Sequence, residues 1–209
     1  MIKDIKNQPV FSYLSLNQKP KAMKTKIITG ILFLLMTGIS VKAQNLLKNG
    51  DLESTPPDGT TPGIGWKYDW SPDESGAINT STAARTGNCG FWIYTAKTGK
   101  NSYTKPYQET GCKSSTNYRA EIYLRTPEGE NWVTGSSAYI TLTFKTSAGV
   151  TVQTLNSDKL TTGNTGWKLF TINAVSPENA ALVRYTINLT SPVGQSICNA
   201  DNCSLVIVK

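Results

Sequence analysis

The chain has 209 residues, of which 38% are hydrophobic, and it contains no His at all. Without His there is no Ser-His-Asp triad, no Cys-His pair and no His-ligated metal, so acid–base chemistry would fall to carboxylates, Tyr or Lys. The net charge is +7, but residues 1–43 hold seven of the 21 basic residues and one of the 14 acidic ones. Residues 44–209 therefore carry a net charge of only +1, which argues against a nucleic-acid-binding surface.

Residues 23–43 have the pattern of a secretory signal peptide. Lys24 and Lys26 precede an apolar run, and Val41-Lys42-Ala43 is a small-x-small cleavage signal. A membrane anchor is the alternative, but the run falls short of the roughly 20 apolar residues that a spanning helix needs. We therefore expect secretion, with cleavage near Ala43 and no stable insertion in a membrane.

Two further features bear on this leader. Residues 1–22 precede a second Met, and because a signal peptide normally starts at its Met we expect them to be a disordered start-site artefact. No Cys follows the cleavage site, so a lipoprotein anchor is not expected. The remaining 44–209 region has the length of one domain.

The 44–209 region is rich in Thr, Ser, Asn and Gly and shows short alternating runs between turn signals such as "KTGKN" and "TTGNTG". About ten strands without a clear helix predict an all-β sandwich or barrel. The expected strands are 45–53, 66–70, 89–96, 103–110, 117–126, 138–146, 150–155, 167–174, 181–190 and 203–208.

Alternation assigns the faces of these strands, because successive side chains of a strand point to opposite sides. The predicted core-facing residues are Phe91, Ile93, Tyr118, Ala120, Ile122, Leu124, Ile140, Leu142, Phe144, Val183, Tyr185, Ile187 and Leu189. The intervening positions leave Trp, Tyr, Arg, Glu and Asn on the solvent side. Such a face suits sugars, since aromatic rings cover C–H surfaces and planar polar groups bond hydroxyls. The alternative is an ordinary sheet face, because Thr, Tyr and Trp are good strand formers.

The region contains four cysteines, Cys89, Cys112, Cys198 and Cys203. An even number in a secreted chain predicts disulfides, and four cysteines allow three connectivities. Zinc is not expected, because CxxC spacing and His are both missing.

Several motifs in order resemble a known family: "NLLKNGDLES", "GW" at 65–66, "ARTGNCGFWIY", "YQETGCKSSTNYRAEIYLRT", "TGWKLF" and "ADNCSLV". They resemble the secreted carbohydrate-binding modules of the CenC type (families 4, 9 and 22), which are galactose-binding-like jelly rolls. The resemblance covers nearly all of 45–209. It departs from the family at Leu52, where Phe is usual, and at Asn202 and Cys203, where Asp and Val are usual.

The resemblance implies a structural calcium ion that ties the first strand to the last. Glu53 and Asp201 match the motif positions, Asp51 is a further candidate ligand, and the loop 85–89 would supply carbonyl oxygens, which suit Ca²⁺. The alternative is that these acids cap turns and bind nothing. Asn202 puts the second C-terminal ligand in doubt.

The same resemblance would place all four cysteines near one end of a jelly roll. Cys198 and Cys203 flank "NADN", taken as a short hairpin that a disulfide would close. Cys89 and Cys112 flank a predicted hairpin centred on "KTGKN" and are the second expected pair, while Cys89–Cys203 remains an alternative.

The family's ligand groove crosses one sheet, on outward strand positions. The expected ligand-binding residues are Trp92, Tyr94, Gln108, Glu121, Tyr123, Arg125, Arg184 and Asn188. Trp66 occupies the core "GW" position, and Trp70 and Trp132 are candidate groove walls.

Three functions are compatible with these features. The first is a secreted, non-catalytic protein that binds polysaccharide or oligosaccharide, alongside co-secreted glycoside hydrolases. The second is a small jelly-roll lyase or glycoside hydrolase, for which Glu121 is the only acid placed mid-strand on the candidate face and lacks a clear carboxylate partner. The third is a structural envelope protein or adhesin.

Overall fold

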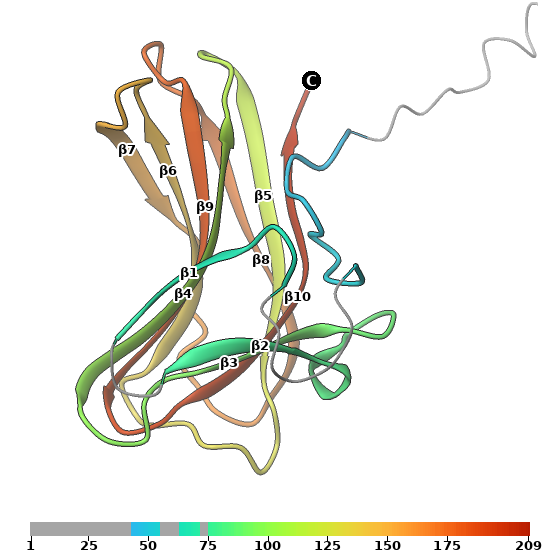
Figure 1. Cartoon of the computed structure of the whole chain (residues 1–209), viewed down its shortest axis with the longest axis vertical. Helices are drawn as coiled ribbons and strands as arrows, with labels where there is room; N and C mark the ends of the chain where they lie inside the picture. Colours follow the sequence, from blue (N-terminus) through green and yellow to red (C-terminus); the bar gives the residue numbers. More distant parts are fainter. Residues whose placement is uncertain (1–42, 55–62, 72–74) are drawn as a thin grey trace, which may run out of the picture. The chain divides into compact units, whose positions relative to one another are not determined.

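The computed structural model describes residues 43–54, 63–71 and 75–209, which form a two-layered jelly-roll β-sandwich (Figure 1). All strand pairs are antiparallel. Sheet 1 has the order β1-β4-β9-β6-β7. Its strands are β1 (Lys67–Trp70), β4 (Lys100–Gly111), β9 (Leu182–Val193), β6 (Ser137–Lys145) and β7 (Thr151–Asn156).

Sheet 2 has the order β2-β3-β10-β5-β8, and a 3-10 turn, Ser81–Ala83, follows its edge strand. Its strands are β2 (Gly76–Thr80), β3 (Gly90–Tyr94), β10 (Ile197–Ile207), β5 (Asn117–Thr126) and β8 (Thr165–Val175). The predicted all-β sandwich is confirmed.

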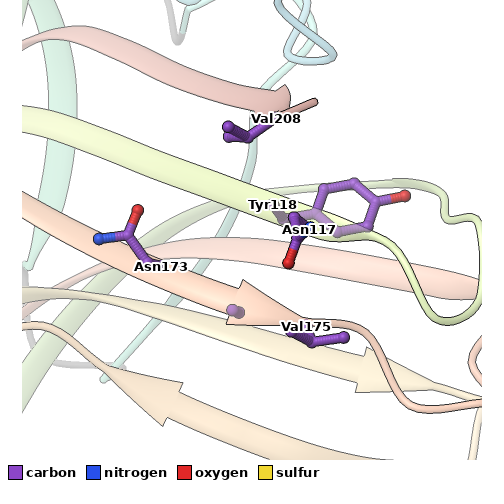
Figure 2. Close-up of a pocket in the computed structure, with 6 residues that line it drawn as sticks. Asn117, Tyr118, Asn173, Val175 and Val208 are labelled. Carbon is purple, nitrogen blue, oxygen red and sulfur yellow. The ribbon is translucent and has the colours of Figure 1, made fainter.

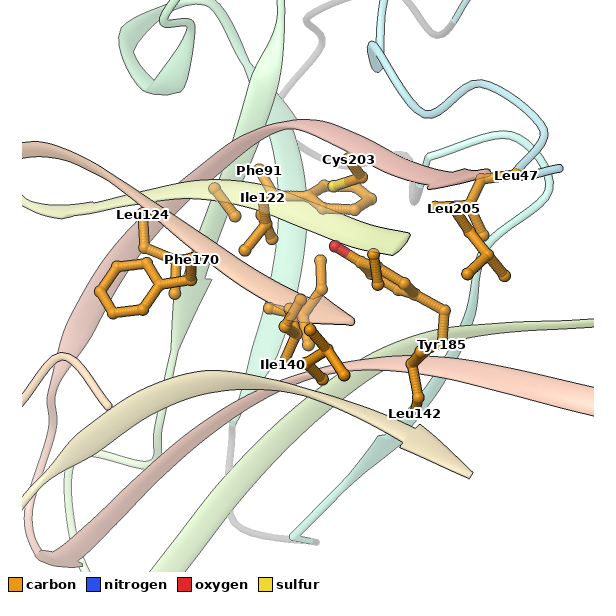
Figure 3. Packing of buried hydrophobic residues seen from close by; sticks show 14 of the residues in the cluster. Leu47, Phe91, Ile122, Leu124, Ile140, Leu142, Phe170, Tyr185, Cys203 and Leu205 are labelled. Atoms are coloured by element: carbon orange, nitrogen blue, oxygen red, sulfur yellow. The ribbon is translucent and has the colours of Figure 1, made fainter. Parts of the chain in front are cut away.

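The core lies between the two sheets and is built from the side chains that alternation predicts (Figure 3). Ile122 and Leu124 of sheet 2 meet Ile140 and Leu142 of sheet 1, and all four are fully buried. The hydroxyl of Tyr185 donates to the backbone oxygen of Glu121 at 2.9 Å, which joins the sheets through the core. Burial raises the pKa of Tyr185 well above its usual value, so this donor stays protonated.

The predicted strand at 45–53 is wrong: these residues form turns. Asn49 and Leu52 adopt φ values of 48° and 64°, which interrupt an extended chain. The segment still lies beside the last strand, as Figure 1 shows, because Leu46 N donates to Leu205 O at 2.8 Å. A Cβ at Gly50 would collide with the backbone oxygen of Cys203, so this close approach requires glycine.

Two strands of sheet 2 differ from the prediction. β2 was not expected, because "GAINT" is short and small-sided and carries no apolar alternation. β10 begins six residues earlier than predicted and pairs with both β3 and β5, with a bulge between Asp201 and Ser204. The segment "NADN" is therefore part of a central strand and not a hairpin.

The predicted disulfides are wrong for the same topological reasons. All four cysteines lie among the described residues, and no disulfide joins any two of them, including the alternative pair Cys89–Cys203. Cys198 and Cys203 sit five residues apart on β10, a span of roughly 16 Å in a strand, whereas bridged Cα atoms lie within about 7 Å. Cys89 precedes β3 and Cys112 follows β4, and these strands belong to different sheets.

Residues 1–42, which include the predicted start-site artefact and nearly all of the predicted signal peptide, lie outside the described residues. Within the described ranges, no helix is long and apolar enough to cross a membrane.

Candidate functional site

The solvent-facing side of sheet 1, here called face 1, is hollowed. Val183, Tyr185 and Ile187 turn inward from β9, so the residues between them project onto face 1. The hollow measures about 340 Å³, which falls within the range of small-molecule sites. Every lining residue carries a polar group: Asp69, Lys105, Tyr107, Thr141, Thr143, Lys145, Thr151, Arg184, Thr186 and Asn188.

A carboxylate holds two cations of this hollow in place. Glu109 on β4 accepts from Lys145 Nζ at 2.6 Å and from Arg184 Nε at 3.0 Å. The hydrogen bond from Lys145, together with the bond and charge of Arg184, lowers the pKa of Glu109, although partial burial opposes the shift. Glu109 therefore stays ionised at neutral pH and is poorly suited to act as a general acid.

Arg184 is also positioned by an aromatic ring. Its guanidinium carbon lies 4.3 Å from the ring centroid of Tyr107, a cation–π arrangement. Among the described residues, only its Nε has a protein acceptor, so the terminal N–H groups remain available to a ligand. Beside it, Lys105 Nζ lies 4.1 Å from the ring centroid of Tyr103.

Asn188 supplies the complementary acceptor, four residues along β9 from Arg184. Its Nδ2 donates to Thr141 Oγ1 at 2.9 Å, which fixes the orientation of the amide. Within the described part of the chain, no protein group donates to its Oδ1. Face 1 thus presents fixed donors and a fixed acceptor beside an aromatic ring, a set that can bond the hydroxyls of a sugar.

The solvent-facing side of sheet 2, here called face 2, carries similar side-chain types, but they bond to one another. Arg125 Nη2 donates to Thr82 O at 2.7 Å. Its guanidinium carbon lies 4.8 Å from the ring centroid of Trp167. In the amide orientation that its neighbours favour, Asn199 Oδ1 accepts from Nε and Nη2 of Arg125 at 3.1 and 3.0 Å. Arg125 is therefore committed to the protein itself.

The rest of face 2 is similarly self-associated. The Arg85 guanidinium lies 3.5 Å from the Tyr123 ring centroid, and its Nη1 donates to Asn202 Oδ1 at 3.1 Å. The rings of Trp92 and Tyr94 pack against each other with centroids 4.9 Å apart. Much of the aromatic surface of face 2 is thereby covered by protein groups.

The eight predicted ligand-binding residues do not share one face. Arg184 and Asn188 lie together on face 1. On face 2 lie Trp92, Tyr94, Glu121, Tyr123 and Arg125, and Glu121 forms an ion pair with Arg119 at 3.3 Å. Residues on opposite outer sides of a sandwich cannot line one groove, so the predicted single groove is divided. Ligand binding by any of these side chains stays a prediction.

The eighth residue, Gln108, points to the interior and has a structural role. Its Oε1 accepts from Lys48 N at 2.9 Å and its Nε2 donates to Lys48 O at 2.7 Å, which fastens the 45–54 turns to β4. Trp66 packs in the core as expected, with its ring centroid 5.3 Å from that of Phe91. Trp70 is 45% exposed but alternates with Asp69 on β1, so it does not line the face 1 hollow.

Asp201, a predicted calcium ligand, is fully buried and clamps a loop. Its Oδ2 accepts from the backbone N–H groups of Arg85 and Thr86 at 2.7 and 3.1 Å, and its Oδ1 accepts from Asn202 N at 2.6 Å. Burial raises the pKa of Asp201, the three hydrogen bonds oppose that shift, and the charge of Glu53 adds to it.

Glu53 holds the other half of the same loop. Its oxygens accept from the backbone N–H groups of Asn88 and Cys89 at 2.8 and 2.9 Å, while Asp51 is exposed. The loop thus turns N–H groups toward the carboxylates, whereas calcium requires oxygen ligands. The described residues hold no group of three or more His, Cys, Asp or Glu that could bind a metal. In this arrangement the oxygens of Glu53 and Asp201 are already bonded to N–H groups, so the site does not fit a calcium ion. Calcium binding, which the family resemblance implies, stays a prediction.

Sequence reasoning missed most of the face 1 hollow. Asp69, Lys105, Tyr107 and Lys145 were not among the expected binding residues, although the strand at 103–110 was expected. Applying alternation to that strand would have placed Tyr103, Lys105, Tyr107 and Glu109 on one side. The sequence therefore contained the alternation that defines this side of β4. It did not show that β4 pairs with β9, which brings these residues next to Arg184.

Figure 2 shows another hollow, of about 290 Å³, at the ends of β5, β8 and β10. Asn117, Tyr118, Asn173, Val175 and Val208 line it, and the Tyr118 side chain is buried. Among the described residues that line the hollow, the Tyr118 phenol is the only ionisable side chain, and it already accepts from Lys113 N at 2.8 Å.

No family model and no curated protein sequence matches this chain. Solved structures do. The CBM22-1 xylan-binding domain of Paenibacillus barcinonensis Xyn10C matches with a TM-score of 0.55 and 15% identity, over 80% of this chain and 96% of that one. TmCBM61 in complex with β-1,4-galactotriose matches with a TM-score of 0.53 and 15% identity, over 79% of this chain and 100% of that one.

A third structure is the enzymatically active domain of tailspike protein 4 from bacteriophage CBA120. Its TM-score is 0.59 at 12% identity, and the match covers 78% of this chain but only 21% of the tailspike chain. Carbohydrate-binding modules are thus among the proteins that share this β-sandwich fold. At these identities the likeness establishes the β-sandwich, and the CenC-type resemblance stays a prediction.

Proposed function

We propose that residues 44–209 form a secreted, non-catalytic carbohydrate-binding module that holds a polysaccharide or oligosaccharide across face 1. The observation that carries this proposal is the hollow in which Arg184, Asn188 and Tyr107 stand together with fixed orientations. The fold shared with carbohydrate-binding modules supports it.

The chemistry of the site favours sugars over apolar ligands. Every described residue that lines the hollow has a polar group, and the ring of Tyr107 is flanked by the Arg184 guanidinium, which can donate to hydroxyls. A pyranose offers hydroxyls around its rim and C–H groups on its faces, which match such a surface. Side chains that are already held in position lose little conformational entropy when a ligand binds.

The non-catalytic part of the proposal rests on Glu109. Hydrolysis of a glycosidic bond generally needs a protonated carboxyl group beside a second carboxylate. The pKa of Glu109 is lowered by Lys145 and Arg184, which keeps it ionised, and both of its neighbours are cations. The module would then act by retaining glycan near co-secreted glycoside hydrolases.

Xylan and β-1,4-galactan are the first ligands to test, because two proteins of this fold are described with xylan or with galactotriose. Affinity electrophoresis of residues 44–209 through gels that contain each polysaccharide, together with other β-glycans, measures binding. We expect retardation by at least one polysaccharide and no release of reducing ends on incubation. Unretarded migration in every gel would remove the binding proposal, and released reducing ends would remove its non-catalytic part.

Secretion is tested separately, by expressing the chain from Met23 in a secreting host. We expect the exported protein to begin at Gln44, which N-terminal sequencing or intact mass reports. Retention of the leader in the exported or membrane fraction would contradict cleavage near Ala43.

A further inference from the structure

A second polar hollow lies between two loops, and it shares no lining residue with face 1. The loop between β5 and β6 forms one wall, and the loop between β7 and β8 forms the other. The hollow measures about 450 Å³, within the range of small-molecule sites. Its lining includes Glu130, Trp132, Thr134, Thr162, Gly163 and Asn164.

Both walls are fixed to the sandwich. Val133 N donates to Ser196 Oγ at 2.9 Å, which ties the first loop to the segment before β10. Thr126 Oγ1 donates to Thr162 O at 3.1 Å, which ties the second loop to the end of β5. A hollow with walls held in this way is formed before any ligand arrives, so binding requires little ordering of loops.

Trp132 provides an aromatic surface in this hollow. Part of the side chain packs against the hydrophobic core, and its Nε1 donates to Thr161 O at 3.3 Å across the two loops. A Cβ on Gly163 would lie 2.9 Å from Trp132 Cβ, so glycine lets the second loop close against the tryptophan. The indole is therefore fixed while it remains partly exposed.

The polar groups around the indole select the class of ligand. Among the described residues that line the hollow, Glu130 is the only one with a charged side chain, and its carboxylate accepts hydrogen bonds without donating any. Thr134 and Thr162 add hydroxyls, and Asn164 adds an amide. Glu130 is exposed, so the hydroxyl groups of a neutral sugar can donate to it, whereas a uronic acid or a sulfate would be repelled.

We infer that this hollow is a second carbohydrate site, which takes one neutral sugar residue as a monosaccharide or as the end of a chain. It acts independently of the binding proposed for face 1. A module with both sites would hold a glycan chain at its interior on face 1 and at its end between the loops.

The test is a ¹H–¹⁵N NMR titration of residues 44–209 with the methyl β-glycosides of galactose, xylose and glucose. We expect at least one of them to cause a saturable shift of the Trp132 indole N–H and of the Gly163 and Asn164 amides, with a millimolar Kd. The Trp132 indole signal is assigned by its loss in Trp132→Phe, which conserves an aromatic side chain in the packing.

Glu130→Gln should weaken this binding on the order of tenfold, because it removes a charged acceptor. The matched control is Glu128→Gln, which changes an exposed carboxylate of the same loop outside the hollow and should leave Kd unchanged. Tyr107→Ala on face 1 should also leave it unchanged, which separates this site from the proposed function. The proposal is overturned if no glycoside shifts these signals up to about 50 mM, or if Glu130→Gln binds as the wild type does.

Discussion

The two outer faces of the sandwich carry the same kinds of side chain and use them differently. On face 2, Arg125 and Arg85 bond to protein acceptors and stack on Trp167 and Tyr123, which consumes both cations and rings. On face 1, Arg184 likewise stacks on Tyr107 and pairs with Glu109, but among the described residues its terminal N–H groups have no protein acceptor, and it lines a hollow of about 340 Å³. The types of residue on a sheet therefore do not identify a binding face. A binding face is identified by polar groups that have no partner in the protein and so remain available to a ligand.

The largest expected effect that separates the faces is on glycan affinity. Tyr107→Ala and Arg184→Ala should each weaken binding of the preferred polysaccharide at least tenfold, since each removes a group that the proposed function places against the sugar. Trp92→Ala, which deletes an outward aromatic residue on face 2, should change Kd by less than about twofold. Isothermal titration calorimetry measures all three. Equal losses from Trp92→Ala and Tyr107→Ala would abolish the distinction between the faces.

The next largest effect is on the free energy of unfolding. Here a substitution on face 2 should have the larger effect, and one on face 1 the smaller. Arg125→Ala should lower the free energy of unfolding by about 1–3 kcal/mol, because Thr82 O and Asn199 lose a charged donor and Trp167 loses its cation. Arg184→Ala should cost less, about 0–1 kcal/mol, because its ion pair with Glu109 remains partly open to solvent, with the two side chains 35% and 29% exposed. Denaturant unfolding gives both values, and a larger cost for Arg184→Ala would show that face 1 is the structural one.

A smaller effect concerns pH. The folded pKa of Glu109 is lowered, so its pairing stabilises the fold above the ordinary carboxyl pKa and is lost as pH falls through the folded pKa. Glu109→Gln should therefore flatten the acid side of a plot of Tm against pH. Asp201 has the opposite sign: its folded pKa is raised by burial, so its contribution weakens as pH rises from the ordinary Asp value through the folded pKa. An unchanged acid limb in Glu109→Gln would contradict the pairing on face 1.

The smallest expected effect is that of calcium. The N–H groups of residues 85–89 already occupy Glu53 and Asp201, so neither calcium nor EDTA should shift Tm. Differential scanning calorimetry with and without each additive measures the shift. A rise in Tm on adding calcium would show that this loop turns its carbonyls inward, as the CenC-type resemblance implies.

The core could be predicted from sequence because burial leaves a local signal. Val183, Tyr185 and Ile187 alternate with polar residues, and a period of two assigns them to the interior without knowledge of any partner strand. The same alternation correctly placed Trp92 and Arg184 on solvent sides. Alternation cannot predict which sheet a strand joins. It shows only which side chains of one strand point to the core and which point to solvent, and both sheets have such a solvent side.

Sheet membership caused the errors at the candidate site. "KTGKN" reads locally as a hairpin turn, yet it carries the chain from β3 in one sheet to β4 in the other. That mistaken hairpin joined Cys89 to Cys112. The CenC-type resemblance, which assigns one sheet to the ligand groove, placed Trp92 and Asn188 together. The bulge in β10, with Asn202 at a φ of 52°, likewise reads as a turn and produced the false hairpin between Cys198 and Cys203.

The central claim is that glycan lies on face 1 and not on face 2. The most direct measurement is a ¹H–¹⁵N NMR titration of residues 44–209 with an oligosaccharide of the polysaccharide that binds best. We predict that the largest amide shifts fall on β9 around Arg184, Thr186 and Asn188 and on β4 around Tyr107. Shifts centred on Trp92 of β3 and Tyr123 of β5, with β9 unchanged, would contradict the account.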